Sequence, residues 1–375
     1  MDPILIVAGE SSGERYGAGL VREFRKLYPE ARFFGIGGKQ MSGEGVEVLF
    51  PMEHLAVMGI FEVISHVPRI RRIFRQIVQE TASRRPAAAV LIDSPDFNLR
   101  LARKLKKAGI PVLYYVSPTV WAWRRGRLKT IRKHVARMML IFPFEEEIYK
   151  AENIPATYIG HPLLERVKAD LSRKDFFAGR GLDPGKKLVV LLPGSRRSEL
   201  RSHGPVLAEA VERIRGSVPA EFVLVLAESL RRADLEKAIP GGIRGLQVID
   251  RDGYSAIAAA DIVLSACGTA TLEAALLGTP VVAYYRISPL TYHVGRRFVR
   301  IRQYSIVNIL AGKAVIPELI QDEFTAGNLS RETIKILESD ELRAEMKADF
   351  LKIRKGLGEG RASENAALEL EKFIR

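Results

Sequence analysis

The chain has little cysteine, no long apolar run and no pattern of metal ligands, and each absence removes a class of protein. Cys267 is the only cysteine among 375 residues. A disulfide framework and a multi-cysteine zinc site are therefore excluded, and a reducing compartment is favoured. No apolar run reaches the roughly 18 residues of a membrane-spanning helix, and the first apolar segment is too short for a secretory signal. These features predict a cytoplasmic protein.

Metal and nucleic-acid binding find little support in the sequence. The six histidines show no ligand spacing, and no Asp-x-Asp pair stands on a loop suited to a metal-bound diphosphate. The net charge of +14 could serve nucleic acid, an anionic membrane or a phosphorylated substrate. No zinc finger, helix-turn-helix or RNA-binding aromatic pattern is present, and most Lys and Arg lie on helix-like segments. We expect no metal, no cofactor and no nucleic-acid partner.

Short and nearly continuous apolar segments alternate along the chain with helical patterns. Strands of this composition are covered on both faces, which is typical of parallel sheets built from βαβ units. The pattern predicts an α/β protein with two Rossmann-like halves, joined at the polar residues 171–187. We expect domains at 1–170 and 171–345, and a helical tail at 346–375 that packs back on the first domain. The predicted strands lie within residues 4–10, 32–38, 88–94, 111–117, 137–143, 188–195, 222–228, 246–250, 261–267 and 280–285.

Two acids stand at the end of a predicted buried strand. Asp93 follows the apolar residues 88–92 directly, and Asp96 comes three residues later. In an open parallel sheet, ligands bind in the crevice at the carboxyl ends of the strands. A carboxylate in that crevice can act as a general base that takes a proton from a substrate hydroxyl. We expect Asp93 to be the base and Asp96 to orient it, although either acid could instead cap the helix that follows.

Glycine-rich turns follow the first strand of each predicted half. In residues 9–19 the turn precedes a helix, so it could bring backbone N–H groups to an anion or simply be a tight connection. In the second half, Gly194 and Ser195 precede Arg196, whose guanidinium can bind a diphosphate through two hydrogen bonds and stabilise a leaving nucleotide. The sequence therefore predicts a diphosphate site at residues 194–196.

A second turn of the C-terminal half is a further candidate phosphate site. Gly268 and Thr269 begin a helix after a predicted strand, where backbone amides and the helix dipole favour phosphate. Glu273, one turn on, can accept hydrogen bonds from both hydroxyls of a ribose, or it can be an ordinary acidic partner of the helix dipole. Cys267 has no neighbour in the sequence that would act as its base, so we interpret it as a packing residue and not a nucleophile.

Several long motifs resemble lipid-A-disaccharide synthases, a family of inverting glycosyltransferases. They occur in the family's order and run almost from end to end of the chain. The motifs are VAGESSGERYGAGL, MEHLAVMGIFEV, IDSPDFN, YYVSPTVWAWRRGR, IGHP, LLPGSRRSE, SACGTATLEAALLGTPVVAYYR and NILAG.

The resemblance implies a fold, a reaction and a set of site residues. The fold would be the GT-B arrangement, two Rossmann-like domains facing across a cleft. The reaction would move 2,3-diacylglucosamine from its UDP derivative to 2,3-diacylglucosamine 1-phosphate, giving a β-1,6-linked disaccharide and UDP. The family pattern also implies that Glu10 belongs to the catalytic group, that Ser12, Gly13 and Asn308 line the acceptor side or cleft, and that Asp93 is the base. An Asn that caps a helix or turn would look the same as Asn308.

An amphipathic stretch at residues 64–78 could contact a membrane. Its apolar residues fall at helical spacing and its arginines occupy the remaining positions, which is typical of an interfacial helix. Core packing explains such a stripe as well, and both interpretations stay open. If lipid is the partner, the protein would be peripheral at the inner face of the cytoplasmic membrane, with contacts from Val67, Ile70, Arg71, Arg72, Phe74 and Ile77.

Two other functions remain compatible with the sequence. Another enzyme that uses a UDP-sugar, such as a nucleotide-sugar epimerase or an N-acetylglucosaminyltransferase, could share the fold. A non-catalytic basic protein that binds anionic membrane would explain the charge and leave the acids at the strand ends unexplained. A homo-oligomer is compatible with all of these functions.

Overall fold

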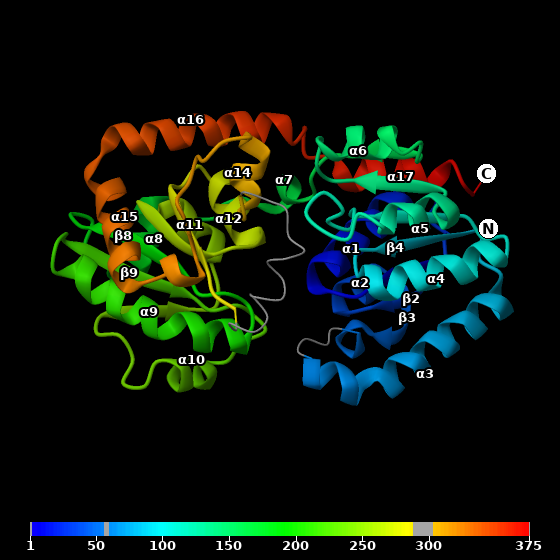
Figure 1. The fold of residues 1–375 in the computed structure, drawn as a ribbon, viewed down its shortest axis with the longest axis horizontal. Helices are drawn as coiled ribbons and strands as arrows, with labels where there is room; N and C mark the ends of the chain where they lie inside the picture. Colours follow the sequence, from blue (N-terminus) through cyan, green and yellow to red (C-terminus); the bar gives the residue numbers. More distant parts are fainter. Residues whose placement is uncertain (1, 56–59, 288–302, 375) are drawn as a thin grey trace. The chain divides into compact units, whose positions relative to one another are not determined.

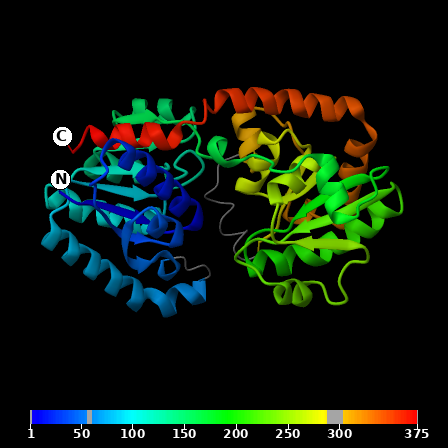
Figure 2. The same ribbon diagram turned by 180° about the vertical axis from the view of Figure 1, so that it is seen from behind.

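The computed structural model describes residues 2–55, 60–287 and 303–374, and the chain divides into two compact units. Unit 1 comprises Met1–Glu165 and Leu357–Arg375, and unit 2 comprises Arg166–Gly356. Figures 1 and 2 show the same architecture in each unit, a twisted sheet with helices on both faces. All strand pairings in both sheets are parallel. The predicted α/β class is confirmed.

Unit 1 contains a seven-stranded sheet with the order β3-β2-β1-β4-β5-β6-β7. Strand order reverses between β1 and β4, which makes their carboxyl ends the switch point where ligands bind in open α/β sheets. The strands are β1 Ile4–Ala8, β2 Phe33–Gly37, β3 Val46–Pro51, β4 Ala88–Ile92, β5 Val112–Tyr115, β6 Arg137–Leu140 and β7 Ala156–Tyr158. The helices are α1 Ser11–Leu27, α2 Lys39–Gly43, α3 Ile60–Arg84, α4 Pro95–Lys107, α5 Arg127–His134, α6 Glu145–Ala151 and α7 Leu163–Arg166, with a 3-10 turn η1 at Met52–His54.

Two apolar layers cover the sheet of unit 1. One contains Leu5, Val7 and Tyr114 together with side chains of α3, α4 and α5. The other contains Ile4 and Ile6 together with side chains of α1 and of the C-terminal helix. Alternate residues of each strand point to opposite faces, and both faces are buried, which explains why the strands are apolar throughout.

Unit 2 contains a six-stranded sheet with the order β10-β9-β8-β11-β12-β13. Its switch point lies between β8 and β11 and repeats the arrangement of unit 1. The strands are β8 Lys187–Leu192, β9 Ala220–Val225, β10 Leu246–Ile249, β11 Ile262–Ala266, β12 Val281–Tyr285 and β13 Glu318–Ile320. The helices are α8 Arg173–Arg180, α9 Arg197–Arg215, α10 Arg232–Ala238, α11 Gly253–Ala259, α12 Thr269–Leu276, α14 Ile306–Ala311, α15 Ala326–Glu338 and α16 Asp340–Gly356, with a 3-10 turn η2 at Gln321–Glu323.

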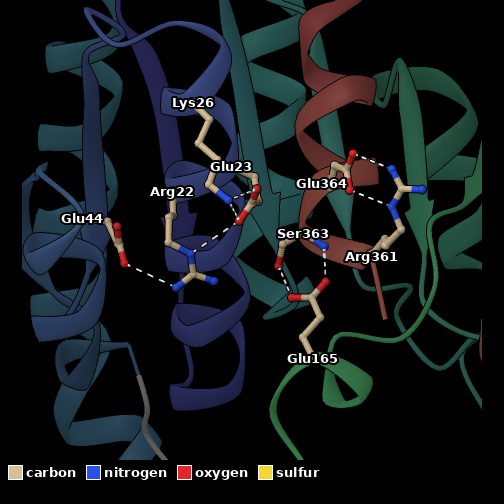
Figure 3. A network of polar contacts seen from close by, with 8 residues as sticks. All are labelled: Arg22, Glu23, Lys26, Glu44, Glu165, Arg361, Ser363 and Glu364. Carbon is tan, nitrogen blue, oxygen red and sulfur yellow. Dashed lines mark hydrogen bonds and ion pairs between the residues drawn. The ribbon is translucent and has the colours of Figure 1, made fainter. Parts of the chain in front are cut away.

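The C-terminal helix α17, Ala362–Glu371, belongs to unit 1, where it packs on α1. Figure 3 shows its first turn beside Glu165, whose two carboxylate oxygens accept hydrogen bonds from the backbone N–H and the hydroxyl of Ser363 at 2.7 and 2.6 Å. Arg361 and Glu364 form an ion pair next to this contact, at 2.6 Å. The chain end at residues 357–375 therefore belongs to unit 1.

The predicted boundaries and helix starts need correction. The first crossing between units falls at residues 165/166, and residues 171–187 belong to unit 2 because α8 lies within them. The returning segment begins at residue 357, since α16 continues unbroken to residue 356 and packs on α12 and α14. Helix α1 begins at Ser11, so it occupies most of the residues 9–19 that were expected to form a turn, and α4 begins at Pro95.

Three strands were not predicted. Strands β3, β7 and β13 are at sheet edges and only partly buried. An edge strand can carry polar residues because one side has no neighbouring strand, so the continuous apolar pattern is absent.

Candidate active site

The turns after β1 and β4 meet at the switch point of unit 1. The two strands are paired in register, with Ala8 opposite Ile92. A Cβ atom on Gly9 would lie 2.1 Å from Ser94 Oγ, so only glycine lets the two turns come this close. Glu10 follows Gly9 in the turn after β1, and Asp93 precedes Ser94 in the turn after β4. The predicted catalytic acids Glu10 and Asp93 are therefore brought to the same edge of the sheet.

Asp93 has an unusual backbone conformation. Its φ is 49°, and the following Ser94 has a φ of 43°, so two consecutive residues other than glycine are in the left-handed region. Such residues cost about 1–3 kcal/mol each and concentrate at functional sites. Asp is among the residues that tolerate this region best. The strained turn is consistent with a site that holds Asp93 in one orientation.

The surroundings of Asp93 raise the pKa of its carboxyl group to about 6. Burial is the largest cause, and the negative charge of Glu10 adds to it. The Ser94 backbone N–H and the Arg127 guanidinium act in the opposite direction. A base with a pKa near the working pH combines a large ionised fraction with good proton affinity. Asp93 therefore has the electrostatic properties that general-base catalysis requires.

Asp96 is exposed and forms ion pairs. Its carboxylate accepts from Arg124 at 3.1 Å and from Arg127 at 3.0 Å, and 74% of its side chain is exposed. Asp96 lies in the first turn of α4, whereas Ser94 occupies the N-cap position. The alternative in which Asp93 or Asp96 caps this helix is therefore wrong. Its contact with Arg127, which acts on the pKa of Asp93, is compatible with an orienting role.

At the β1–α1 turn, Glu10, Ser12, Gly13 and Glu14 are half-buried or buried. Ser12 is half-buried in the first turn of α1, and Gly13 is packed against Ile92, where a Cβ atom would lie 3.2 Å from Ile92 Cγ2. Glu10 occupies the N-cap position, but its side chain does not cap the helix. Glu14 is buried and accepts a hydrogen bond from the Gln40 backbone N–H at 2.7 Å. Glu14 is thus a structural residue, and the acceptor roles of Ser12 and Gly13 remain predictions.

In unit 2 the turn after β8 is built around a buried carboxylate. Glu199 Oε2 accepts hydrogen bonds from the backbone N–H groups of Ser195 at 2.9 Å and Arg196 at 3.2 Å. Glu199 Oε1 accepts from Arg196 Nη1 at 2.9 Å and from the Tyr285 hydroxyl at 3.1 Å. Gly194 has a φ of 114°, and a Cβ atom there would collide with Glu199 at 2.4 Å. The carboxylate therefore fixes both the turn and the guanidinium of Arg196.

The turn after β11 lies at the same sheet edge, because Leu192 of β8 is opposite Ser265 of β11. Gly268 is the N-cap of α12 and Thr269 is its first residue, as predicted, and both are exposed. Glu273 is half-buried on the same helix and accepts a hydrogen bond from the Tyr254 hydroxyl at 3.0 Å. The predicted donor residues thus occupy the two turns at the switch point of unit 2.

Asn308 does not line a binding surface. Its side chain is buried and makes four hydrogen bonds, donating to Ile316 O and Glu318 Oε1 and accepting from the N–H groups of Val315 and Ile316. These bonds use its full capacity. The prediction that Asn308 contacts the acceptor is therefore wrong, and the residue fixes the loop that leads into β13.

Two further residues are structural. Burial raises the pKa of the Cys267 thiol to about 12, so the thiol stays protonated and unreactive at neutral pH. Burial lowers the pKa of His161 to about 3, and its Nδ1 accepts from the Leu163 backbone N–H at 3.1 Å. A neutral buried imidazole of this kind stabilises the turn that leads into α7 and does not change its protonation state near pH 7.

The apolar stripe of α3 is largely a core face. Ile73 and Ile77 are 3% and 0% exposed, and Phe74 packs against the same core with its ring 5.5 Å from that of Phe97. The prediction that Ile77 contacts a membrane is therefore wrong, and that for Phe74 is not supported. Val67 and Ile70 are half-buried, and Arg71 and Arg72 are exposed. The side chains of residues 60–66, and residues 56–59 of the MEHLAVMGIFEV motif, lie outside the described part.

Sequence reasoning missed a buried acid near the same edge of unit 1. Glu145, the first residue of α6, is 1% exposed, and burial raises its pKa to about 8 despite its contact with Ser117. The Ser117 hydroxyl lies 2.7 Å from that of Tyr149. The three consecutive glutamates at residues 145–147 read as an exposed helix start, and no signal in the sequence marks the first as buried.

Two further observations concern only the described residues. Among residues 2–55, 60–287 and 303–374, no group of three or more His, Cys, Asp and Glu side chains is arranged to hold a metal ion. In the same ranges, no helix is both long and apolar enough to cross a bilayer.

The architecture defines the class of protein. Two parallel α/β units with polar turns at their switch points form the GT-B fold, which is shared by solved structures of low sequence identity. A UDP-GlcNAc 2-epimerase from Neisseria meningitidis has a TM-score of 0.68 at 14% identity, covering 99% of this chain and 100% of that one. MurG from Acinetobacter baumannii has a TM-score of 0.61 at 13% identity, covering 99% of this chain and 100% of that one.

The sequence comparisons give the family. The family model described as lipid-A-disaccharide synthetase matches residues 4–372. A lipid-A-disaccharide synthase from Solibacter usitatus is 42% identical over 100% of this chain and 98% of its own, and one from Geobacter sulfurreducens is 42% identical over 97% and 95%. The chain belongs to the lipid-A-disaccharide synthase family. The predicted glycosyltransferase activity in lipid A biosynthesis is thereby confirmed.

Proposed function

We propose that the chain transfers 2,3-diacylglucosamine from UDP to the 6-hydroxyl of 2,3-diacylglucosamine 1-phosphate. The observation that carries this proposal is the family match over residues 4–372. The products would be the β-1,6-linked disaccharide 1-phosphate and UDP. The positions of the acids and of Arg196 at the two switch points support the same chemistry.

In the proposed mechanism, Asp93 removes the proton from the acceptor hydroxyl while its oxygen attacks the anomeric carbon. The bond between that carbon and the diphosphate oxygen breaks, and the electron pair leaves with UDP. Arg196 stabilises the negative charge on the leaving diphosphate. Backbone N–H groups at Gly268 and Thr269 contact phosphate, and Glu273 accepts from the ribose hydroxyls. Unit 1 supplies the base, and unit 2 supplies the donor-binding residues.

A turnover assay tests the proposal. The purified protein is incubated with UDP-2,3-diacylglucosamine, with and without the acylated acceptor, and released UDP and the disaccharide are measured. We expect UDP release only when both substrates are present. Consumption or isomerisation of the donor without acceptor would identify an epimerase instead, and binding to anionic vesicles without any turnover would indicate a non-catalytic protein.

The pH dependence of turnover should report on Asp93. Only the ionised carboxylate accepts a proton, so the rate should rise with pH through a midpoint near the Asp93 pKa of about 6. Replacing Glu10 by Gln removes a like charge, which lowers the pKa of Asp93 and moves this midpoint to lower pH. The phosphate of the acceptor titrates near pH 6 as well, but it is common to both proteins, so the shift between them is diagnostic. A midpoint that stays in place or rises would show that Glu10 does not act on the base.

We also propose a peripheral contact with the inner face of the cytoplasmic membrane through the N-terminal part of α3. Val67 and Ile70 are half-buried and stand beside the exposed Arg71 and Arg72, and cationic side chains near an apolar face favour anionic lipid. This location would suit an enzyme whose two substrates carry acyl chains.

The membrane contact can be separated from core packing by paired variants. Replacing Val67 and Ile70 by Ser should reduce association with anionic liposomes while the melting temperature changes little. Ile77→Ser is the matched control, because a buried Ile contributes about 2–5 kcal/mol to folding and its loss should lower the melting temperature strongly. If the Val67 and Ile70 variant binds liposomes as the unmodified protein does, this part of α3 is not the membrane contact.

A further inference from the structure

The backbone of Asp93 is held from both sides by buried groups. Its N–H donates to Tyr115 O at 3.0 Å. Its carbonyl oxygen accepts two hydrogen bonds, from the Tyr114 hydroxyl at 2.6 Å and from Asn98 Nδ2 at 2.8 Å. Both peptide groups on either side of the Asp93 Cα are thus fixed, and only the side-chain torsions remain free.

The two carbonyl partners come from different elements. Tyr114 is in β5, which pairs with β4, and Asn98 is in the first turn of α4. Both side chains are 0% exposed. Asn98 Nδ2 also donates to Ile92 O at 3.1 Å. Tyr114 from the neighbouring strand and Asn98 from the following helix therefore both bind the backbone where the left-handed turn of Asp93 and Ser94 begins.

A tyrosine hydroxyl that is removed from water must find a partner or lose hydrogen-bonding energy. Tyr114 finds its partner at the carbonyl of the proposed base, and burial raises the pKa of its hydroxyl well above the usual value, so it remains a donor. The left-handed φ values of residues 93 and 94 are unfavourable in themselves. The hydrogen bonds from Tyr114 and Asn98 to the Asp93 carbonyl favour the left-handed conformation. In a relaxed backbone conformation the carbonyl would turn away and lose these bonds.

We propose that Tyr114 and Asn98 are positioning residues for catalysis, which clamp the Asp93 carbonyl and thereby aim the Asp93 carboxylate at the acceptor hydroxyl. Neither side chain contacts the substrates in this mechanism; both act through Asp93. The inference rests on the proposed role of Asp93 as the base and adds the residues that orient it. Catalysis is sensitive to such orientation, because a displacement of about 1 Å can cost about a hundredfold in rate.

The neighbouring tyrosine provides a matched control. Tyr115 is also 0% exposed, but it points into the apolar layer on the other face of the sheet. Its hydroxyl has no hydrogen-bond partner among the residues that the structure describes. Tyr114→Phe and Tyr115→Phe each remove one buried hydroxyl from adjacent residues of one strand. Only Tyr114→Phe removes a hydrogen bond to the Asp93 carbonyl.

The experiment compares kcat, donor KM and UDP affinity in the two variants. We expect Tyr114→Phe to lower kcat by about ten- to a hundredfold and to leave UDP affinity unchanged, because UDP is assigned to unit 2. Tyr115→Phe should stay within about twofold of the unmodified protein in all three quantities. Equal kcat values in the two phenylalanine variants would overturn the inference.

Asn98→Ala gives a second approach if Tyr114→Phe fails to fold. Asn98 Oδ1 has no partner in the described part of the chain, so the alanine variant loses only the two carbonyl contacts. We expect the same selective fall in kcat. A fall in stability with kcat unchanged in the folded fraction would show that the clamp is structural and would contradict the proposal.

A double variant tests whether Tyr114 acts through Asp93. Residues that act as a unit show strongly non-additive effects on kcat. Adding Tyr114→Phe to Asp93→Asn should therefore cost nothing beyond Asp93→Asn alone, whereas full additivity would contradict a role through Asp93. Near-normal turnover of Asp93→Asn by itself would overturn the base assignment, which is distinguishable from equal behaviour of the two phenylalanine variants.

Discussion

Asp93→Asn should fold normally and lose most of its turnover. The amide has the shape of the carboxylic acid, and Asn tolerates the left-handed φ of 49° as well as Asp does. It cannot accept the proton of the acceptor hydroxyl at neutral pH. General-base catalysis contributes roughly 10²–10⁴-fold, so kcat should fall by about that factor, which corresponds to about 3–5 kcal/mol of barrier. Calorimetry with UDP should give an unchanged affinity, since the nucleotide is assigned to unit 2.

Asp96→Asn is the matched control for this prediction. Asp96 is exposed and ion-paired with Arg124 and Arg127, and exposed pairs contribute little to stability. Its loss should reduce kcat far less than the loss of Asp93, and any effect should come through the orientation of Arg127. A larger fall for Asp96→Asn than for Asp93→Asn would move the base to Asp96. Normal turnover in both variants would leave Glu10 as the remaining acid of the predicted catalytic group.

The strand ends of the site could be predicted because their physical cause is local in sequence. A strand covered on both faces must be apolar throughout, so the polar residues that follow it mark the edge of the sheet. This pattern located Asp93 after β4, Arg196 after β8 and Gly268 after β11. The same argument places the switch points once the strand order is known, but the order itself comes from contacts distant in sequence.

The partners of these residues could not be predicted. Tyr114 is 21 residues from Asp93, and Tyr285 is 86 residues from Glu199, yet each pair forms a hydrogen bond. Asn308 looked like a site residue because an Asn in a loop motif has the same appearance whether its amide faces a ligand or four groups of the protein. Sequence shows which side chains can form hydrogen bonds, and only the fold determines with which groups.

The stripe of α3 illustrates a related limit. Helical spacing shows that one face is apolar, and the gain from burial is about the same whether the face meets a core or a lipid. Ile73 and Ile77 meet the core of unit 1, so only the residues before them remain available for a membrane. Whether the apolar face of α3 meets a core or a membrane depends on where α4 and β4 lie. The sequence pattern of α3 does not give that position.

Arg196→Ala should weaken donor binding and turnover together. The guanidinium is 42% exposed and pairs with Glu199 at 2.9 Å, so it is held in place with donors left to contact a diphosphate. Hydrogen bonds to charged groups contribute about 1.5–3 kcal/mol, which predicts a loss of UDP affinity of about ten- to a hundredfold. Because charge grows on the diphosphate as UDP leaves, kcat/KM should fall further than UDP affinity does.

Two variants make this last prediction specific to Arg196. Arg197 is adjacent and 63% exposed but pairs with Asp234 at 3.0 Å, so Arg197→Ala removes the same charge from the same helix start without removing the proposed diphosphate ligand. It should change UDP affinity by no more than about the twofold to fivefold of a nearby exposed charge. Arg196→Lys should recover part of the affinity, since a point charge replaces the two-pronged guanidinium. Calorimetry with UDP decides the matter: equal affinities in the two alanine variants would show that the effect is general electrostatics, and Arg196 would then lose its place as the diphosphate ligand.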